Sequence, residues 1–109
     1  MKVFLYDIET DYEFDDSQTN DETDLETALD EFYTLSEEDG SFFGIIDDFD
    51  KCIQFAYTEN KNWLVDIPNP PSFENLQAYA SYDECVALIE KVYKKGKITD
   101  EILQGQNFR

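Results

Sequence analysis

The sequence of 109 residues predicts an α+β fold, in which an antiparallel β-meander of four to five strands carries two main helices on one face. Short β-prone segments joined by tight polar turns are typical of a meander. Two further segments, on either side of it, repeat apolar residues at helical spacing. The expected order is β-α-β-β-β-(β)-α-α. We expect a single domain, 1–109, made of an acidic loop and helix (10–40), the meander (41–80) and C-terminal helices (81–104).

The chain before the meander is expected to hold one strand, an acidic loop and one helix. Residues 2–8 are almost continuously apolar, which predicts a strand buried on both faces. Residues 10–22 are polar, acidic and without a period, and they predict a loop. In the helix that follows, Thr23 and Glu26 fit a capping box, and Gly40 is a natural residue just beyond the helix end.

The meander is expected to contain three strands and a further strand at its edge. Residues 41–47 and 52–57 predict strands that flank an acidic turn, and residues 63–67 alternate in polarity as a half-buried strand does. Residues 76–80 predict the edge strand. Prolines from Pro68 onward end the third strand, because proline cannot donate a ladder hydrogen bond.

The second helix has the clearest pattern in the sequence. Ser81 and Glu84 form a second capping box, and Gly96 ends the helix. Its apolar stripe consists of Tyr82, Cys85, Val86, Ile89, Val92 and Tyr93. Thr99 is expected to cap a final short helix.

The charge is distributed unevenly along the chain. The sequence contains 26 acidic and 8 basic residues, a net charge of −18. Residues 1–50 contain 18 acids and one base, a net of −17, whereas residues 51–109 contain 8 acids and 7 bases, a net of −1. A surface this negative repels phosphate, so we expect no direct binding of nucleic acid or of an anionic membrane.

The composition excludes several further classes. The chain has no histidine, which excludes Ser/His/Asp catalysis, Cys/His catalysis and His-ligated zinc, and we expect neither an enzyme nor a cofactor. No apolar run approaches the ~20 residues of a membrane span. The chain reaches an acid at Asp7, so no signal peptide is expected. Cys52 and Cys85 are expected to be buried thiols in a reducing cytoplasm.

The segment FLYDIET (4–10) supports an alternative function. Asp7 and Glu9 follow an apolar strand, and the pair resembles the first metal-binding motif of DnaQ-like 3′–5′ exonucleases, in which carboxylates hold two metal ions. Tyr79 and Asp83 have the Tyr-x-x-x-Asp spacing of a later motif in that family. The resemblance implies a metal-dependent exonuclease. The other interpretation is that the two acids mark the end of a buried strand.

The acidic loop supports a second alternative, a calcium-binding module. The ligand positions of an EF-hand-like loop would be taken by Asp11, Glu13, Asp15, Ser17, Thr19 and Glu22. However, Asp16 stands where such a loop needs glycine, and a strand rather than a helix precedes it. A solvated acidic loop is the other interpretation.

The acids and the rings among them predict a site for a basic protein partner. Its residues are Asp11, Tyr12, Glu13, Phe14, Asp15, Asp16, Asp30, Glu31, Glu37, Glu38, Asp39, Asp47 and Asp48. The carboxylates are expected to pair with Arg and Lys, and Tyr12 and Phe14 to act as anchors. The acids at 37–39 are expected at the C-terminal end of the first helix, where the helix dipole disfavours anions. The alternatives are a surface made for solubility, rings folded back onto the core, and a plain polar turn at 47–50.

The meander and the helix after it carry a further resemblance. Residues 41–96 run from a turn into KCIQFAY and WLVDIP, through an aromatic-containing edge segment, to SYDECVALIEKVYKKG. In this pattern the chain resembles an immunity protein of bacterial polymorphic-toxin systems. The resemblance implies a non-catalytic cytoplasmic protein that blocks one basic cognate toxin, a nuclease or a nucleic-acid deaminase. A phage-type nucleic-acid mimic that inhibits a host nuclease is the alternative, and the oligomeric state stays open.

Overall fold

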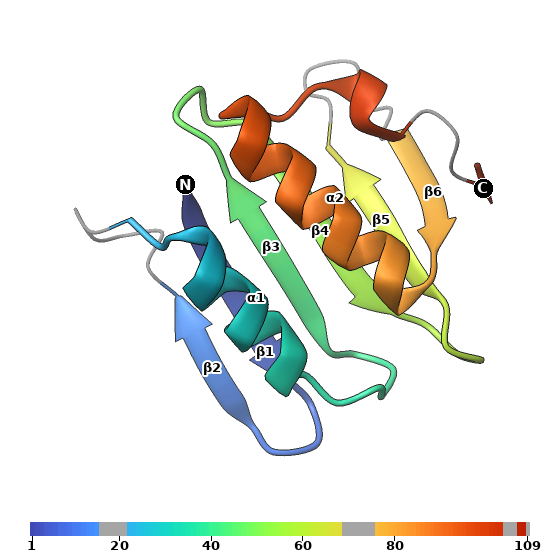
Figure 1. The fold of residues 1–109 in the computed structure, drawn as a ribbon. Helices are drawn as coiled ribbons and strands as arrows, with labels where there is room; N and C mark the ends of the chain where they lie inside the picture. The colour runs from blue at the N-terminus through green and yellow to red at the C-terminus, as the bar shows by residue number, and fades with distance from the viewer. Residues whose placement is uncertain (16–21, 69–75, 104–106, 109) are drawn as a thin grey trace.

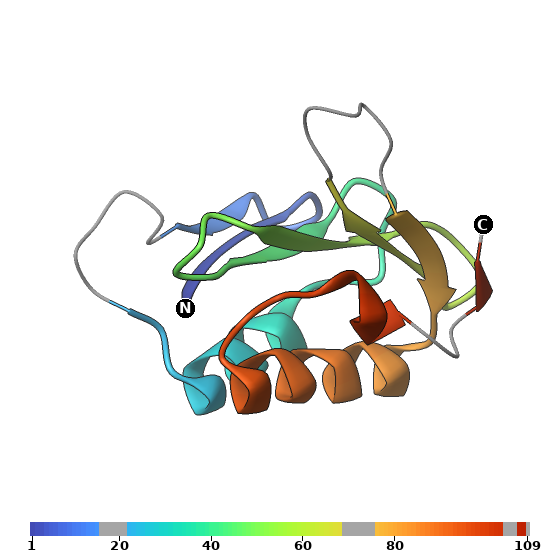
Figure 2. The same ribbon diagram turned by 90° about the horizontal axis from the view of Figure 1, so that it is seen from above.

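The computed structural model describes residues 1–15, 22–68, 76–103 and 107–108. In chain order, its elements are β1 (Lys2–Asp7), β2 (Tyr12–Asp15), α1 (Leu25–Thr34), β3 (Phe42–Ile46), β4 (Cys52–Tyr57), β5 (Trp63–Ile67), β6 (Leu76–Ala80), α2 (Tyr82–Lys95), the 3₁₀ helix η1 (Asp100–Leu103) and β7 (Asn107–Phe108). The strands form one antiparallel sheet in the order β2-β1-β3-β4-β5-β6-β7, and both α-helices lie on the same face of it (Figure 1, Figure 2).

This architecture confirms the predicted α+β class, whereas the predicted number of four to five strands is too small. The additional strands are β2 and the two-residue β7, which pairs outside the predicted edge strand β6. Within the described ranges, none of the helices has the length and apolarity of a membrane span.

The strand β2 lies at the edge of the sheet, where the sequence predicts a loop. It pairs with β1 in an antiparallel register, as Phe14 does with Leu5. Successive side chains of a strand point to opposite faces. Phe14 therefore packs against the core, whereas Glu13 and Asp15 lie on the other face. The alternation of rings and acids from Tyr12 onward is a strand period of two, which the high acid content conceals.

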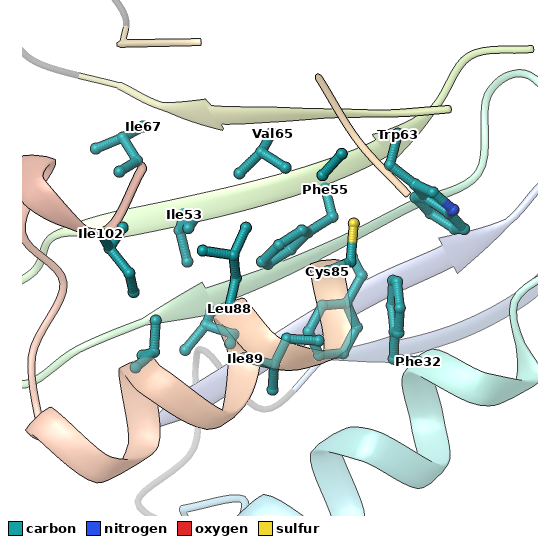
Figure 3. Packing of buried hydrophobic residues seen from close by; sticks show 14 of the residues in the cluster. Phe32, Ile53, Phe55, Trp63, Val65, Ile67, Cys85, Leu88, Ile89 and Ile102 are labelled. Carbon is teal, nitrogen blue, oxygen red and sulfur yellow. The ribbon is translucent and has the colours of Figure 1, made fainter. Parts of the chain in front are cut away.

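The hydrophobic core lies between the sheet and the two helices (Figure 3). The fully buried helix residues are Ala28 and Phe32 of α1 and Cys85, Leu88, Ile89 and Val92 of α2. The Phe32 ring centroid lies 4.9 Å from that of Trp63 and 5.2 Å from that of Phe43, both on the sheet. It also stacks on Tyr82 of α2, with centroids 5.2 Å apart. One aromatic side chain therefore joins both helices to the sheet.

The first helix begins one position later than predicted. Asp24, rather than Thr23, is the N-cap, and its carboxylate accepts a hydrogen bond of 2.8 Å from the backbone N–H of Thr27. Thr23 is buried, and its backbone N–H donates to the carbonyl of Met1 at 3.0 Å. This bond ties Thr23 to the start of β1, so the helix starts after it.

The first helix also ends earlier than predicted, at Thr34. The backbone N–H and the hydroxyl of Ser36 both donate to the buried carboxylate of Asp7, at 3.1 Å and 2.6 Å. These bonds draw the chain out of the helix well before Gly40. The acids at 37–39 therefore lie in a loop, and the predicted conflict with the helix dipole is wrong.

The predicted start and end of the second helix are confirmed. The Ser81 hydroxyl accepts from the N–H of Glu84 at 3.2 Å, and the Glu84 carboxylate accepts from the N–H of Ser81 at 2.9 Å. Gly96 closes the helix with φ 74°, a left-handed conformation that suits glycine. The predicted final short helix is η1, which is a 3₁₀ helix.

Candidate functional site

The two faces of the sheet differ in what covers them. Both α-helices pack on one face, and no described helix lies on the other, which we call the open face (Figure 2). The alternation along β1 places Phe4 and Tyr6 on the open face. The strand register places Phe42 of β3 on one side of them. Glu13 and Asp15 of β2 lie on the other side. Aromatic rings and carboxylates therefore meet on the open face.

A depression of ≈ 360 Å³ lies among these side chains. It is lined by Phe4, Leu5, Tyr6, Glu13, Asp15 and Phe42. The rings form a continuous group, because the Phe42 centroid lies 6.2 Å from that of Phe4 and 6.1 Å from that of Tyr6. The Tyr6 hydroxyl donates to the Asp11 carboxylate at 2.6 Å. This hydrogen bond, then burial and the nearby carboxylates, raise the pKa of Tyr6, so its ring stays neutral.

The shape of the depression depends on Gly44. This residue lies directly opposite Phe4 in the register between β1 and β3. A Cβ atom at position 44 would overlap the Phe4 ring, so the ring lies over the glycine. Because Phe4 leans toward β3, space stays open on its other side, toward Glu13 and Asp15.

One end of the sheet gathers exposed acids from two segments. The turn after β1 (8–11) and the loop after α1 (35–41) lie side by side there, because the Ile8 N–H donates to the Ser41 hydroxyl at 3.1 Å. The exposed acids of these two segments are Glu9, Asp11, Glu37, Glu38 and Asp39. They flank Ile8, whose side chain is 46% exposed. Within the described part of the chain, none of these five acids forms an ion pair.

The depression and the acidic end form one continuous surface, because Phe42 lines the first and directly follows the loop of the second. We call it the acidic-aromatic surface. It comprises Phe4, Tyr6, Ile8, Glu9, Asp11, Glu13, Asp15, Glu37, Glu38, Asp39 and Phe42. An apolar centre with a charged rim is the usual composition of a protein-binding interface.

Asp7 is a metal ligand in the exonuclease interpretation. In the structure its carboxylate is buried and hydrogen-bonded within the fold. It is 3% exposed, and its carboxylate accepts from the Glu9 N–H at 3.0 Å and from the N–H and hydroxyl of Ser36. Burial raises the pKa of the Asp7 carboxyl, but these hydrogen bonds outweigh burial and leave the pKa below its ordinary value. Tyr79 lies on β6, four strands from β1 and so about 19 Å away, and Asp83 lies in the first turn of α2. The four residues do not converge, so the geometry gives the exonuclease interpretation no support.

The structure removes Asp47 from the predicted binding site. It is 5% exposed, and its carboxylate accepts from three backbone N–H groups, those of Phe49 (2.8 Å), Lys51 (2.9 Å) and Ile98 (2.8 Å). It therefore closes the β3–β4 turn, ties it to the segment after α2, and is not available to a partner. The neighbouring Asp48 is exposed, but it lies at the end of the sheet opposite to the acidic end.

The other predicted residues lie around β2 and α1. Tyr12 is 42% exposed, and its hydroxyl donates to the Glu31 carboxylate at 3.0 Å. Burial and this bond raise the pKa of Tyr12. Phe14 is half-buried against the core, so it is not an anchor for a partner. Asp30 is exposed on α1, and Asp16 lies outside the described residues.

The described residues of the predicted calcium loop do not converge on a common point. Asp11 has φ 61° in the turn after β1, and Glu13 and Asp15 project from an extended strand rather than around an ion. Ser17 and Thr19 lie outside the described residues. Where side chains are described, no group of three or more His, Cys, Asp or Glu is placed to hold a metal.

The aromatic part of the surface escapes prediction from the sequence. A continuous apolar run predicts burial on both faces of β1, but burial alternates along it. Val3 and Leu5 are fully buried, whereas Phe4 and Tyr6 are only half-buried. The available signal is the alternation itself, since the aliphatic residues face the helices and the aromatic ones the open face.

Comparison of the chain with protein-family models, with curated proteins and with solved structures found no match.

Proposed function

We propose that this protein is a non-catalytic inhibitor that binds a basic protein partner through the acidic-aromatic surface. In its most specific form, the proposal is a cytoplasmic immunity protein whose partner is a bacterial toxin acting on nucleic acid. One observation carries the proposal. An open depression lined by three aromatic rings adjoins five exposed carboxylates that form no ion pair within the described residues.

The carboxylates at the acidic end support a cationic partner, because like charges gathered at one place repel one another. Two unit charges 4 Å apart interact by about 1 kcal/mol in water, and salt screens the interaction over about 10 Å. Glu37, Glu38 and Asp39 are consecutive, and Glu9 and Asp11 lie in the adjacent turn. A bound cationic surface relieves this repulsion.

The exposed apolar side chains support a protein partner rather than a solubility surface. Solubility requires charge, and it does not require Ile8 at 46% exposure or Phe42 at 37% exposure among the charges. Rings at the centre of an interface supply the short-range binding energy, and the carboxylates around them supply steering over a longer range.

The charge also supports the class of target. An enzyme that acts on nucleic acid carries a basic surface for its polyanionic substrate. An acidic protein that covers this surface competes with the substrate and associates rapidly by electrostatic steering. The concentration of acids in residues 1–50, with a net charge of −17, fits this role.

Affinity capture from the source organism, with the purified full chain as bait, tests the proposal. We expect a basic protein that elutes with the chain as a stable complex in size-exclusion chromatography. The purified partner should cleave or deaminate nucleic acid, and an equimolar amount of this protein should abolish that activity. Expression of the partner in a bacterial host should stop growth, and co-expression of this protein should restore it.

A matched pair of variants makes the test specific. Glu37→Lys/Glu38→Lys/Asp39→Lys should lose inhibition, whereas the control Asp48→Lys/Glu90→Lys/Glu101→Lys should retain it, because the control residues are exposed and lie outside the acidic-aromatic surface. A partner that is a host nuclease, with no toxin activity of its own, would assign the protein to the nucleic-acid mimics. Capture of an acidic partner, or inhibition that both triples leave intact, would overturn the proposal.

A further inference from the structure

We infer that the depression on the open face receives a single arginine side chain of the basic partner. This inference rests on the proposed function and specifies which chemical group the surface recognises. A volume of ≈ 360 Å³ is near the lower limit of small-ligand sites, about 300 Å³, so the depression has room for one long side chain.

The aromatic rings of the depression favour a cationic side chain. Phe4, Tyr6 and Phe42 contribute three rings with centroid separations of 6.2 Å and 6.1 Å. A guanidinium over an aromatic face is held by the ring quadrupole, and the attraction increases as water is excluded. The aliphatic stem of the same side chain covers apolar surface in the depression.

The carboxylates favour arginine over lysine. Glu13 and Asp15 lie on the same face of β2, two residues apart and therefore roughly 7 Å from Cα to Cα. A guanidinium presents five N–H donors in a planar fork, so it can stack on a ring and donate to two carboxylates at once. The ammonium of lysine is a compact point charge, which cannot satisfy both carboxylates and stack in the same pose.

Gly44 and Asp11 give the depression its fixed shape. Gly44 lets the Phe4 ring lie over β3, and the Tyr6 hydroxyl is held by the Asp11 carboxylate at 2.6 Å. The rings are therefore positioned before a ligand arrives, which reduces the entropy lost on binding.

An NMR titration of the ¹⁵N-labelled full chain tests the inference. The probes are N-acetyl-arginine methylamide, the corresponding lysine compound and the corresponding citrulline compound, which has the shape of arginine without its charge. We expect saturable shifts of the backbone amides of Phe4, Tyr6, Glu13, Asp15 and Phe42 with the arginine probe. The lysine probe should bind more weakly, and the citrulline probe should cause no saturable shift.

The variant Glu13→Gln/Asp15→Asn should weaken binding of the arginine probe by about tenfold or more, because each lost charge-assisted hydrogen bond is a large part of so small an interaction. The control Glu59→Gln/Glu90→Gln should bind as the natural chain does, and the amide spectrum of each variant reports whether it is folded. Equal binding of citrulline, or arginine shifts confined to residues 37–39, would overturn the inference. Concentration-dependent shifts without any probe would overturn it as well, since they would assign the face to a second copy of the chain.

The two proposals can fail separately. If a basic toxin is inhibited but its affinity is unaffected by Glu13→Gln/Asp15→Asn, only the arginine site is wrong. If the arginine probe binds in the depression but the captured partner is not basic, only the proposed function is wrong.

Discussion

The two faces of the sheet are formed by the same strands but have different roles. The covered face is fully apolar where α1 and α2 pack on it, and Val3, Phe43, Phe55 and Val65 are all 0% exposed there. The open face places rings beside carboxylates, and Phe42 remains 37% exposed. Alternation along each strand therefore separates the residues that stabilise the fold from those that are available to a partner.

The acids also fall into two groups, one buried and one exposed. Asp7 and Asp47 are buried at opposite ends of the sheet, and each receives several hydrogen bonds from the backbone or a hydroxyl. The acids of the turn 8–11 and of the loop 35–41 are exposed. Buried acids hold turns in place, and exposed acids create the field around the open face. Sequence position alone does not distinguish the two groups.

The largest expected effect on stability comes from removing the ring of Phe32, which packs at the centre of the covered face. Phe32→Ala should lower the free energy of unfolding by about 4 kcal/mol, because the ring joins both helices to the sheet and leaves a cavity when removed. Phe42→Ala, on the open face, should cost roughly 1 kcal/mol or less. Urea denaturation of both variants measures the difference. Equal losses would show that the open face also stabilises the fold.

The next largest effect on stability is expected at Asp47, the buried acid of the β3–β4 turn. Asp47→Ala should destabilise the fold by about 3 kcal/mol, because three backbone N–H groups lose their acceptor. Asp48→Ala, one residue further along, should change stability by less than about 0.5 kcal/mol, as is usual for an exposed position. Thermal melts of the two variants provide the comparison, and a destabilised Asp48→Ala would contradict it.

A smaller change in stability is expected when the pH is lowered, because Asp7 becomes protonated. The pKa of this carboxyl is lower in the folded chain than in the unfolded chain, because hydrogen bonds outweigh burial. Its stabilisation is therefore complete above the unfolded value of about 3.9 and is lost as pH falls through the folded value. The stability difference between the natural chain and Asp7→Asn should be constant near pH 6 and shrink below about pH 4. A difference that stays constant at low pH would contradict the account of Asp7.

The smallest effect on stability, but a clear one on binding, is expected at Gly44. Gly44→Ala should displace the Phe4 ring toward the depression, because the added Cβ overlaps the ring. We expect a stability change of roughly 1 kcal/mol or less, since the ring lies on the open face, together with weaker binding of the arginine probe. Calorimetry and the NMR titration measure the two. Unchanged probe affinity would show that the depression does not depend on Phe4.

Much of the fold is predictable from the sequence because local signals and burial agree there. The capping box of Ser81 and Glu84, the stop at Gly96 and the meander strands all follow this rule. The end of α1 cannot be predicted from the local sequence. It depends on hydrogen bonds from Ser36 to the carboxylate of Asp7, which is distant in the chain. No local pattern reports a contact between residues so far apart in the chain.

The candidate site is predictable only in part. The exposed acids at 37–39 and in the turn after β1 follow from charge, whereas the burial of Asp47 depends on Ile98, which reaches it only in the folded chain. The aromatic face is concealed because Phe4 and Tyr6 contribute to an apolar run that suggests complete burial. Register with β2 and β3, which sequence does not state, brings them together with Glu13 and Phe42.

The measurement that tests the central claim most directly is the salt dependence of association with the captured partner. Two triples are compared, Glu37→Lys/Glu38→Lys/Asp39→Lys and Asp48→Lys/Glu90→Lys/Glu101→Lys. Each substitution changes the charge by two, so both triples shift the net charge of −18 by the same six units. If the acidic-aromatic surface meets the partner, only the first triple should slow association and flatten its dependence on salt. Equal slowing by both triples, or none by the first, would contradict the account.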